Sequence, residues 1–208
     1  MRCYDAGVTE TKHTGARLED YSHLSKTGQR VVARYRRRFV SHTAGAVESI
    51  LEVGCGQGWL LKETGKAHPE AKLTGIDMRP EALEFARGLV PSAEFVLQDV
   101  HELPFDDASF DLVICSDVLE HVETPATVVH EIRRVSRGFG VISVPHEPFF
   151  WAANLVRGKH LRTLGNYPEH VNHFGKGALR RLLEPEFASV IIDTSFPWLI
   201  AEVHDSSV

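Results

Sequence analysis

The sequence is poor in cysteine and lacks long apolar runs, and these absences narrow the class of protein. Its three cysteines, Cys3, Cys55 and Cys115, are too few and too scattered for a disulfide framework or a thiolate metal cage. No apolar run is long enough to cross a bilayer, and residues 1–21 lack the apolar core of a signal peptide. The chain also lacks excess positive charge, and its net charge of −5 argues against general nucleic-acid binding. We therefore expect a soluble cytoplasmic protein that contacts neither nucleic acid nor membrane.

The composition is that of an ordinary folded domain. Hydrophobic residues make up 43% and charged residues 25% of 208 residues, so the chain can bury a core. Residues 1–47 form an N-terminal tail and cap in this interpretation, with a helix expected from residue 17 to 49. Residues 48–208 form the main domain, with an insertion at 145–180 that covers a substrate.

From residue 49 onward, short apolar runs alternate with amphipathic stretches. Strands are expected at 49–53, 72–77, 93–97, 110–115, 140–144, 190–193 and 198–201, and helices at 59–67, 80–89, 124–135 and 176–183. This alternation is typical of an α/β fold in which helices cover both faces of a parallel sheet. The last two strands, joined through Pro197, are expected to close the sheet edge as an antiparallel pair.

The clearest motif is a glycine-rich turn directly after the first strand. Gly54, Gly56 and Gly58 occupy alternate positions in Leu51-Glu52-Val53-Gly54-Cys55-Gly56-Gln57-Gly58. Glycine permits positive φ and close approach of a ligand, and the helix that follows points free N–H groups toward it. The spacing differs from the G-x-G-x-x-G fingerprint of nicotinamide-dependent oxidoreductases, which makes that alternative weaker.

Two carboxylates follow at the ends of the next two strands. Asp77 ends the second strand, where a carboxylate can accept both hydroxyls of a ribose. Asp99 follows the third strand, where a carboxylate beside a backbone N–H can bind the amino edge of adenine. Either aspartate alone is more often a turn or helix cap. All three features in order predict a nucleoside site at the carboxyl edge of the sheet.

Residues 48–145 resemble the core of class I S-adenosylmethionine-dependent methyltransferases, in particular the broad small-molecule group. The matching segments are Leu51 to Gly58, Gly75-Ile76-Asp77, Gln98-Asp99-Val100, Leu103-Pro104-Phe105, Ser109-Phe110-Asp111 and Asp117-Val118-Leu119-Glu120-His121-Val122. The resemblance implies a Rossmann-like seven-stranded mixed sheet of order 3-2-1-4-5-7-6 with strand 7 antiparallel. It also implies S-adenosyl-L-methionine as cofactor and a small-molecule acceptor, with O-methylation the first expectation. One departure is Arg137-Gly138-Phe139-Gly140 where the family often has Pro-Gly-Gly.

The same resemblance assigns roles by position. Gly54, Gly56 and Gly58 would surround the methionine part of the cofactor, and Glu52 would fix the loop or reach the amino group. Asp77 would bind the ribose. The remaining expected cofactor contacts are Met78 on the adenine, Asp99 and Val100 at the adenine edge, and Ser116 at the junction with the acceptor.

Two histidines are candidate general bases for an acceptor that is protonated at working pH. His121 follows the fourth strand and His146 the fifth, so both should lie near the open edge of the sheet, where an imidazole can titrate near neutrality. The simpler interpretation of His121 is that it caps or packs a helix.

A metal site is a further possibility, although we assign no metal ligand. Asp117, Glu120 and His121 would share one face of a helical turn, and His170 and His173 could complete a divalent-ion site. Similar arrangements occur in metal-assisted 2′-O-methyltransferases of small RNAs and in ubiquinone-pathway O-methyltransferases, with a Glu where this chain has Asp117. Pocket-lining histidines without a metal are the commoner case.

Two other features have open interpretations. The arginines of the first expected helix form either a solvated face or a lid over an anion-binding pocket; they are Arg30, Arg34, Arg36, Arg37 and Arg38. The insertion contains aromatic side chains that could exclude water from an acceptor or pack for their own stability. Together with His170 they are Phe149, Phe150, Trp151 and Tyr167.

A catalytically silent cofactor-binding module is the alternative from a different functional class. The oligomeric state, monomer or homodimer, stays open.

Overall fold

The computed structural model describes residues 25–147, 149 and 170–205. The expectations for residues 1–24 and for Phe150, Trp151 and Tyr167 lie outside this range. The elements, in chain order, are α1 (Lys26–Ser41), β1 (Ser49–Val53), α2 (Trp59–Ala67), β2 (Lys72–Asp77), α3 (Pro80–Leu89), β3 (Glu94–Leu97), β4 (Leu112–Ser116), α4 (Pro125–Val135), β5 (Phe139–Pro145), α6 (Lys176–Leu183), β6 (Ser189–Ser195) and β7 (Trp198–His204).

The seven strands form one mixed sheet of order β3-β2-β1-β4-β5-β7-β6. Strands β1 to β5 pair in parallel, and β7 pairs antiparallel with both β5 and β6. The order and the antiparallel strand confirm the expected fold. Parallel pairing places the carboxyl ends of β1, β2 and β4 at one edge, which is where the glycine turn and Asp77 follow their strands.

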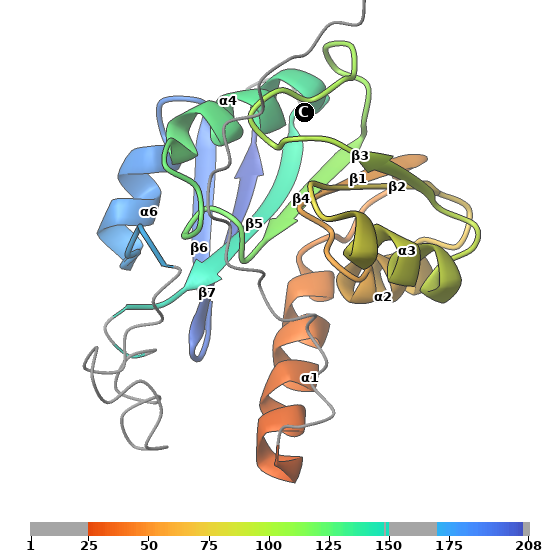
Figure 1. The fold of residues 1–208 in the computed structure, drawn as a ribbon. Helices are drawn as coiled ribbons and strands as arrows, with labels where there is room; N and C mark the ends of the chain where they lie inside the picture. Colours follow the sequence, from red (N-terminus) through yellow and green to blue (C-terminus); the bar gives the residue numbers. More distant parts are fainter. Residues whose placement is uncertain (1–24, 148, 150–169, 206–208) are drawn as a thin grey trace, which may run out of the picture.

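Helices cover both faces of this sheet, and Figure 1 shows α2 and α3 on the side opposite α4 and α6. Side chains of α1, α2 and α3 pack with Ile50 and Leu112 in one core. Side chains of α4 and α6 pack with Leu51 and Val113 in the other. Adjacent strand residues therefore enter opposite cores, which explains why these strands are continuously apolar rather than alternating.

Helix α1 is shorter than the expected span of 17–49. It ends at Ser41, and residues 42–48 form a connection into β1. The last turn is closed locally, because the Thr43 hydroxyl donates to the Val40 carbonyl and the His42 N–H donates to the Phe39 carbonyl. The extension of the helix to residue 49 was wrong because these local caps, followed by Gly45, outweigh the apolar spacing.

Two smaller boundary differences have similar local causes. Phe110 lies outside β4 and forms an isolated bridge with Ser136, because Asp111 turns the chain by accepting N–H bonds from Glu48 and Ser49. The terminal hairpin is longer than expected, since β7 pairs along its whole length with β5 as well as β6.

Candidate functional site

The turn after β1 depends on glycine at three positions. Gly54, Gly56 and Gly58 have φ of 69°, 51° and 76°, in the left-handed region that other residues avoid. A Cβ at Gly54 would lie 2.3 Å from the Val118 Cγ2 atom, so the turn also has no room for a side chain there. Gly58 is the N-cap of α2 and offers no side-chain cap, which leaves the N–H groups of that helix available to a ligand.

Asp77 is held against this turn. Its carboxylate is buried at the end of β2 and accepts the Gly56 N–H on Oδ2 at 2.8 Å and the Arg79 N–H on Oδ1 at 2.9 Å. These two backbone donors fix the rotamer of the carboxylate and tie the end of β2 to the glycine turn.

The Arg79 side chain covers the same carboxylate. Its Nε donates to Oδ1 of Asp77 at 3.0 Å and its Nη2 to Oδ2 at 3.2 Å. A carboxylate has about four acceptor positions, and two backbone and two guanidinium donors fill them all. Any ligand hydroxyl that binds Asp77 must therefore displace the guanidinium, because the backbone donors are fixed by the fold.

A pocket opens between the glycine turn, the end of β4 and helix α1, with a free volume of about 70 Å³. We call it the glycine-turn pocket. Its lining residues are Val32, Tyr35, Arg36, Glu52, Gly54, Cys55, Gly56, Gln57, Trp59, Leu60, Arg79, Ser116, Asp117 and Trp198. Helix α1 closes one side, and its Arg36 guanidinium lies 5.6 Å from the centroid of the Trp59 ring. Three aromatic rings, those of Tyr35, Trp59 and Trp198, therefore share the wall of this pocket with several charged and polar side chains.

The wall opposite the glycine turn is an aromatic and hydroxyl network. Tyr35 of α1 stacks on Trp198 with ring centroids 4.4 Å apart, and its hydroxyl is 2.7 Å from the Ser116 Oγ and also hydrogen-bonded to the Ser143 Oγ. The Trp198 Nε1 donates to Asp117 Oδ1 at 2.9 Å. Burial, and secondarily the Asp117 charge, raise the pKa of Tyr35, so this wall contributes a neutral hydroxyl.

The predicted cofactor residues fall into two groups in the structure. Glu52, Gly54, Gly56 and Ser116 line the glycine-turn pocket, while Asp77 contacts two of its lining residues, Gly56 and Arg79, and Gly58 ends the same turn as the N-cap of α2.

The remaining three lie beyond Asp77, along the ends of β2 and β3. Met78 is half-exposed and Val100 is buried in the core. Asp99 is exposed, and its Oδ1 accepts the His101 N–H at 2.9 Å. The bonds of Asp99 are thus those of a turn aspartate, and its adenine contact stays a prediction.

Neither candidate base lines the glycine-turn pocket. His121 is exposed and its ring lies 4.9 Å from that of His170. His146 lies just after β5, and its Nδ1 is buried without a hydrogen-bond partner among the described residues. Burial, with a smaller contribution from Lys176, lowers the pKa of His146, so its ring is mostly neutral at pH 7. A neutral imidazole is the form that can accept a proton.

The residues weighed as metal ligands are partly brought together. One ligand atom each from Glu120, His121 and His170 lies within 4.8 Å of the other two, in an arrangement that could hold a metal ion. The Glu147 Oε1 is 3.8 Å from the His170 Nδ1. The expected helical turn is a non-helical turn, in which the His121 N–H donates to the Val118 carbonyl. This turn directs Asp117 to Trp198, and neither Asp117 nor His173 belongs to the cluster.

Several pocket residues escaped the sequence analysis. Tyr35 and Trp198 come from the first helix and the last strand, so only tertiary contact places them beside the glycine turn. Arg36, one of the helix arginines considered above as a possible lid over a pocket, lines the same pocket. Arg79 had a local signal, because it follows Asp77 by two residues and a long cation there can fold back on the carboxylate.

Comparisons with known proteins agree with this geometry. Residues 51–144 match the family model described as a methyltransferase domain. The chain is 39% identical over 112 residues to the ubiquinone biosynthesis O-methyltransferase of Alkalilimnicola ehrlichii, which covers 50% of this chain and 44% of the relative. It is 28% identical over 162 residues to the malonyl-[acyl-carrier protein] O-methyltransferase of Legionella pneumophila, which covers 75% of this chain and 55% of the relative.

Solved structures show the same fold. The magnesium protoporphyrin IX methyltransferase of Synechocystis PCC 6803, with bound S-adenosylhomocysteine, superposes with a TM-score of 0.65 at 17% identity, covering 88% of this chain and 89% of that one. The chain spans about half the length of the two O-methyltransferase relatives described above.

Proposed function

Because the chain belongs to the class I S-adenosylmethionine-dependent methyltransferases, we propose that it transfers a methyl group from S-adenosyl-L-methionine to an oxygen atom of a small-molecule acceptor. The observation that carries this proposal is the junction of the glycine turn with Asp77. A left-handed turn without room for Cβ atoms lies beside a buried carboxylate at the carboxyl edge of a parallel sheet. The O-methyltransferases among the relatives support oxygen as the methylated atom.

The residues of the chain fit the cofactor in the following way. Asp77 would accept the ribose hydroxyls once Arg79 has moved, and the backbone of the glycine turn would pack against the methionine portion. Glu52, buried at the pocket, would hold the loop or the amino group. The other assigned contacts are Met78, Asp99 and Val100 for adenine and Ser116 for the junction with the acceptor.

The cofactor, when bound, supplies a methyl group on a positively charged sulfur. The reaction is an in-line displacement in which the acceptor oxygen forms a bond to the methyl carbon while the carbon–sulfur bond breaks and sulfur keeps the electron pair. The main task of the protein is therefore alignment and exclusion of water, which α1, Tyr35 and Trp198 would provide. His146, whose neutral ring has one nitrogen able to accept a proton, or else His121, would take the acceptor proton.

Cofactor binding and turnover test this proposal separately. We expect the purified chain to bind S-adenosylhomocysteine with a 1:1 heat signal in calorimetry and to transfer labelled methyl groups to at least one phenolic or carboxylic acceptor. Absence of binding would refute the function. Binding without transfer to any acceptor in a broad screen would favour the catalytically silent, regulatory module instead.

The cluster of Glu120, His121 and His170 favours a second candidate, a metal-assisted O-methyltransferase. Two imidazoles and a carboxylate suit a divalent transition-metal ion such as Zn²⁺ or Mn²⁺. An ion there would orient acceptor oxygens and lower their pKa, so a separate base would be less important. In that case His121 would be a metal ligand rather than a base.

Metal titration decides between the two candidates. We expect Mn²⁺ or Zn²⁺ to bind the wild-type chain, and Glu120→Gln or His170→Ala to weaken binding at least tenfold, because each removes one of three ligands. Glu123→Gln and His130→Ala, exposed residues outside the cluster, are the matched controls. No bound ion by elemental analysis and no difference between the two pairs of variants would rule out this candidate.

The remaining assignments complete the proposal. The acceptor is a small molecule and nucleic acid is not a partner, in line with the net charge of −5. No helix in the described part of the chain is long and apolar enough to span a membrane.

We place the protein in the cytoplasm as a monomer or homodimer. Its domain organisation would be a tail and cap at residues 1–47 and a catalytic domain at 48–208, in which residues 145–180 cover the acceptor. Within that cover, Phe149 is exposed, with its ring 4.9 Å from that of His146.

A further inference from the structure

The arginines of α1 have different surroundings in the fold. Arg36 lies over the Trp59 ring in the glycine-turn pocket, and the Arg38 Nε donates to Asp193 Oδ2 of β6 at 2.6 Å. Arg34 and Arg37 point away from the buried face of the helix and are exposed. Within residues 25–147, 149 and 170–205, no acidic side chain pairs with either of them.

These two arginines line a second hollow, which we call the arginine hollow. It lies between α1 and the end of β6, has a volume of about 300 Å³, and is lined by Arg34, Arg37, Arg38, Ser41, Thr194 and Ser195. Every lining side chain is either a cation or a hydroxyl. A hollow with this lining is suited to an anion rather than to an apolar group.

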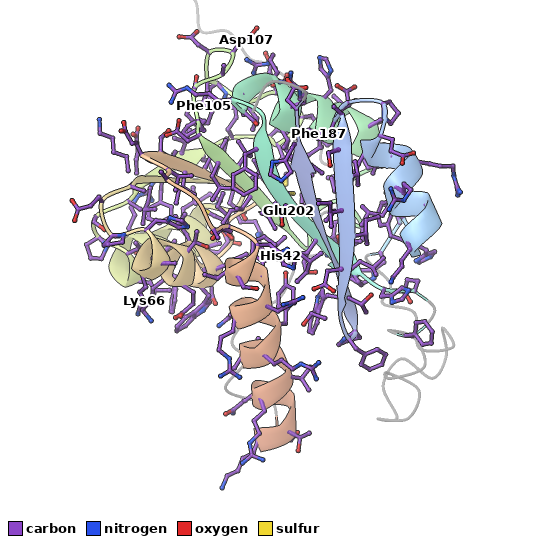
Figure 2. The ribbon with its side chains drawn as sticks, turned by 180° about the vertical axis from the view of Figure 1, so that it is seen from behind. His42, Lys66, Phe105, Asp107, Phe187 and Glu202 are labelled. Carbon is purple, nitrogen blue, oxygen red and sulfur yellow. The ribbon has the colours of Figure 1, made fainter. Side chains whose placement is uncertain are left out.

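The nearby acids are already engaged by other groups. Asp193 accepts from Arg38 and lies 3.2 Å from the His42 Nε2, and His42 Nδ1 is 3.0 Å from Glu202 Oε2. Figure 2 shows His42 and Glu202 together where α1 meets β7. Burial opposes ionisation of Asp193, but its bonds from Arg38, the Thr194 backbone and His42 outweigh that effect and lower its pKa. This network anchors α1 and leaves Arg34 and Arg37 in excess.

The hydroxyls at the hollow point to the same conclusion. The Thr194 Oγ1 and Ser195 Oγ are buried and have no hydrogen-bond partner among the described residues. Buried hydroxyls are normally satisfied, because an unmade bond costs free energy in the folded state. A bound oxyanion would pair with the guanidinium groups, and it would accept hydrogen bonds from these hydroxyls once they turned from their buried positions toward the hollow.

We propose that the arginine hollow is a binding site for a phosphate group. Phosphate fits better than a single carboxylate, because its larger charge and additional oxygens match two guanidinium groups that have no acidic partner in the described part of the chain, together with hydroxyl donors. The hollow adjoins the proposed active site, since Ser195 pairs across the hairpin with Trp198, whose other contacts form the wall of the glycine-turn pocket. The phosphate is either part of the acceptor or a free ligand, and both have the same recognition chemistry.

Titration of inorganic pyrophosphate into the S-adenosylhomocysteine-free chain at low ionic strength tests the site itself. We expect the double variant Arg34→Gln/Arg37→Gln to bind pyrophosphate at least tenfold more weakly than wild type. The matched control is Lys26→Gln/Arg30→Gln, which removes the same charge from exposed positions of the same helix outside the hollow. Ser195→Ala should weaken binding about threefold without any change of charge. Equal weakening in both double variants, or no binding to wild type at millimolar concentration, would overturn the proposal.

A second arm identifies the source of the phosphate. If the phosphate is part of the acceptor, the alkyl chain of a phosphate ester would extend toward the glycine-turn pocket, and the ester should bind more tightly to protein that already holds S-adenosylhomocysteine. If the phosphate is a free ligand, bound S-adenosylhomocysteine should not change its affinity. The site does not depend on the proposed methyl transfer. Loss of pyrophosphate binding in the Arg34/Arg37 variant would support it even if no S-adenosylhomocysteine bound.

Discussion

Replacement of Asp77 by alanine is expected to weaken S-adenosylhomocysteine binding by about 100-fold or more, on the basis of two lost hydrogen bonds to a charged acceptor at roughly 1.5 kcal/mol each. In the wild-type chain the carboxylate is buried and oriented by the Gly56 and Arg79 N–H groups, so it can accept both ribose hydroxyls once the Arg79 guanidinium has moved away. Alanine removes the acceptor and also releases the glycine turn from the end of β2. Isothermal titration calorimetry measures the effect, and thermal unfolding of the same variant shows whether the fold persists.

Arg79→Met is not expected to weaken S-adenosylhomocysteine binding, in contrast to Asp77→Ala. The guanidinium occupies two acceptor positions of Asp77, so its removal should leave S-adenosylhomocysteine binding unchanged or tighter by several-fold. The methionine side chain keeps most of the aliphatic length of the arginine that it replaces. Arg87→Met is the control on the same helix, since Arg87 donates to the Phe95 carbonyl and does not contact Asp77. If Asp77 served only to hold Arg79, both the Asp77 and the Arg79 variants would weaken binding, and the ribose assignment would be wrong.

Gly54→Ala is expected to destabilise the fold by about 2–5 kcal/mol, from left-handed strain and overpacking together. The new Cβ would lie 2.3 Å from Val118 Cγ2 at a residue with φ of 69°. Relief of this clash would require the turn to move away from Val118, and such a movement would also displace Gly56 from Asp77. Chemical denaturation should therefore show lower stability, and calorimetry should show lost cofactor binding in the protein that remains folded.

Gly88→Ala is the matched control for that experiment. Gly88 lies in α3, its φ is outside the left-handed region, and a Cβ there would meet no atom within 4 Å. Alanine favours the helix over glycine by roughly 0.5–1 kcal/mol, so this variant should be slightly more stable than wild type. A similar small effect at Gly54 would show that the turn is not sterically constrained, and the argument from the glycine turn would fail.

Much of the fold could be predicted because its strands are buried on both faces. The short strands expected at Ser49–Val53 and Lys72–Asp77, and the helices of about ten residues that follow them, are confirmed residue for residue in β1, α2, β2 and α3. Predictions were poorer where local hydrogen bonds compete with hydrophobic spacing. Thr43 ended α1 early, and Asp111 excluded Phe110 from β4.

The histidines show a different limit of sequence analysis. Spacing alone grouped Asp117 with Glu120 and His121, but the positive φ of Asp117 and the turn that follows direct its carboxylate to Trp198. His170, which was weighed as a further ligand from its residue type, does lie with Glu120 and His121, although it comes from a segment about fifty residues away. No periodicity within the chain could have predicted that contact.

The sequence by itself determined the sheet, its glycine turn and the order of the polar groups along its edge, because strand burial, left-handed glycines and strand-end carboxylates are local properties. The tertiary structure alone decided which side chains enclose the pocket and which cations have no acidic partner among the described residues. Tyr35 meets Trp198, and Arg38 meets Asp193, only because α1 packs beside the last hairpin. Such contacts depend on the packing of distant elements, which the linear spacing of residues does not encode.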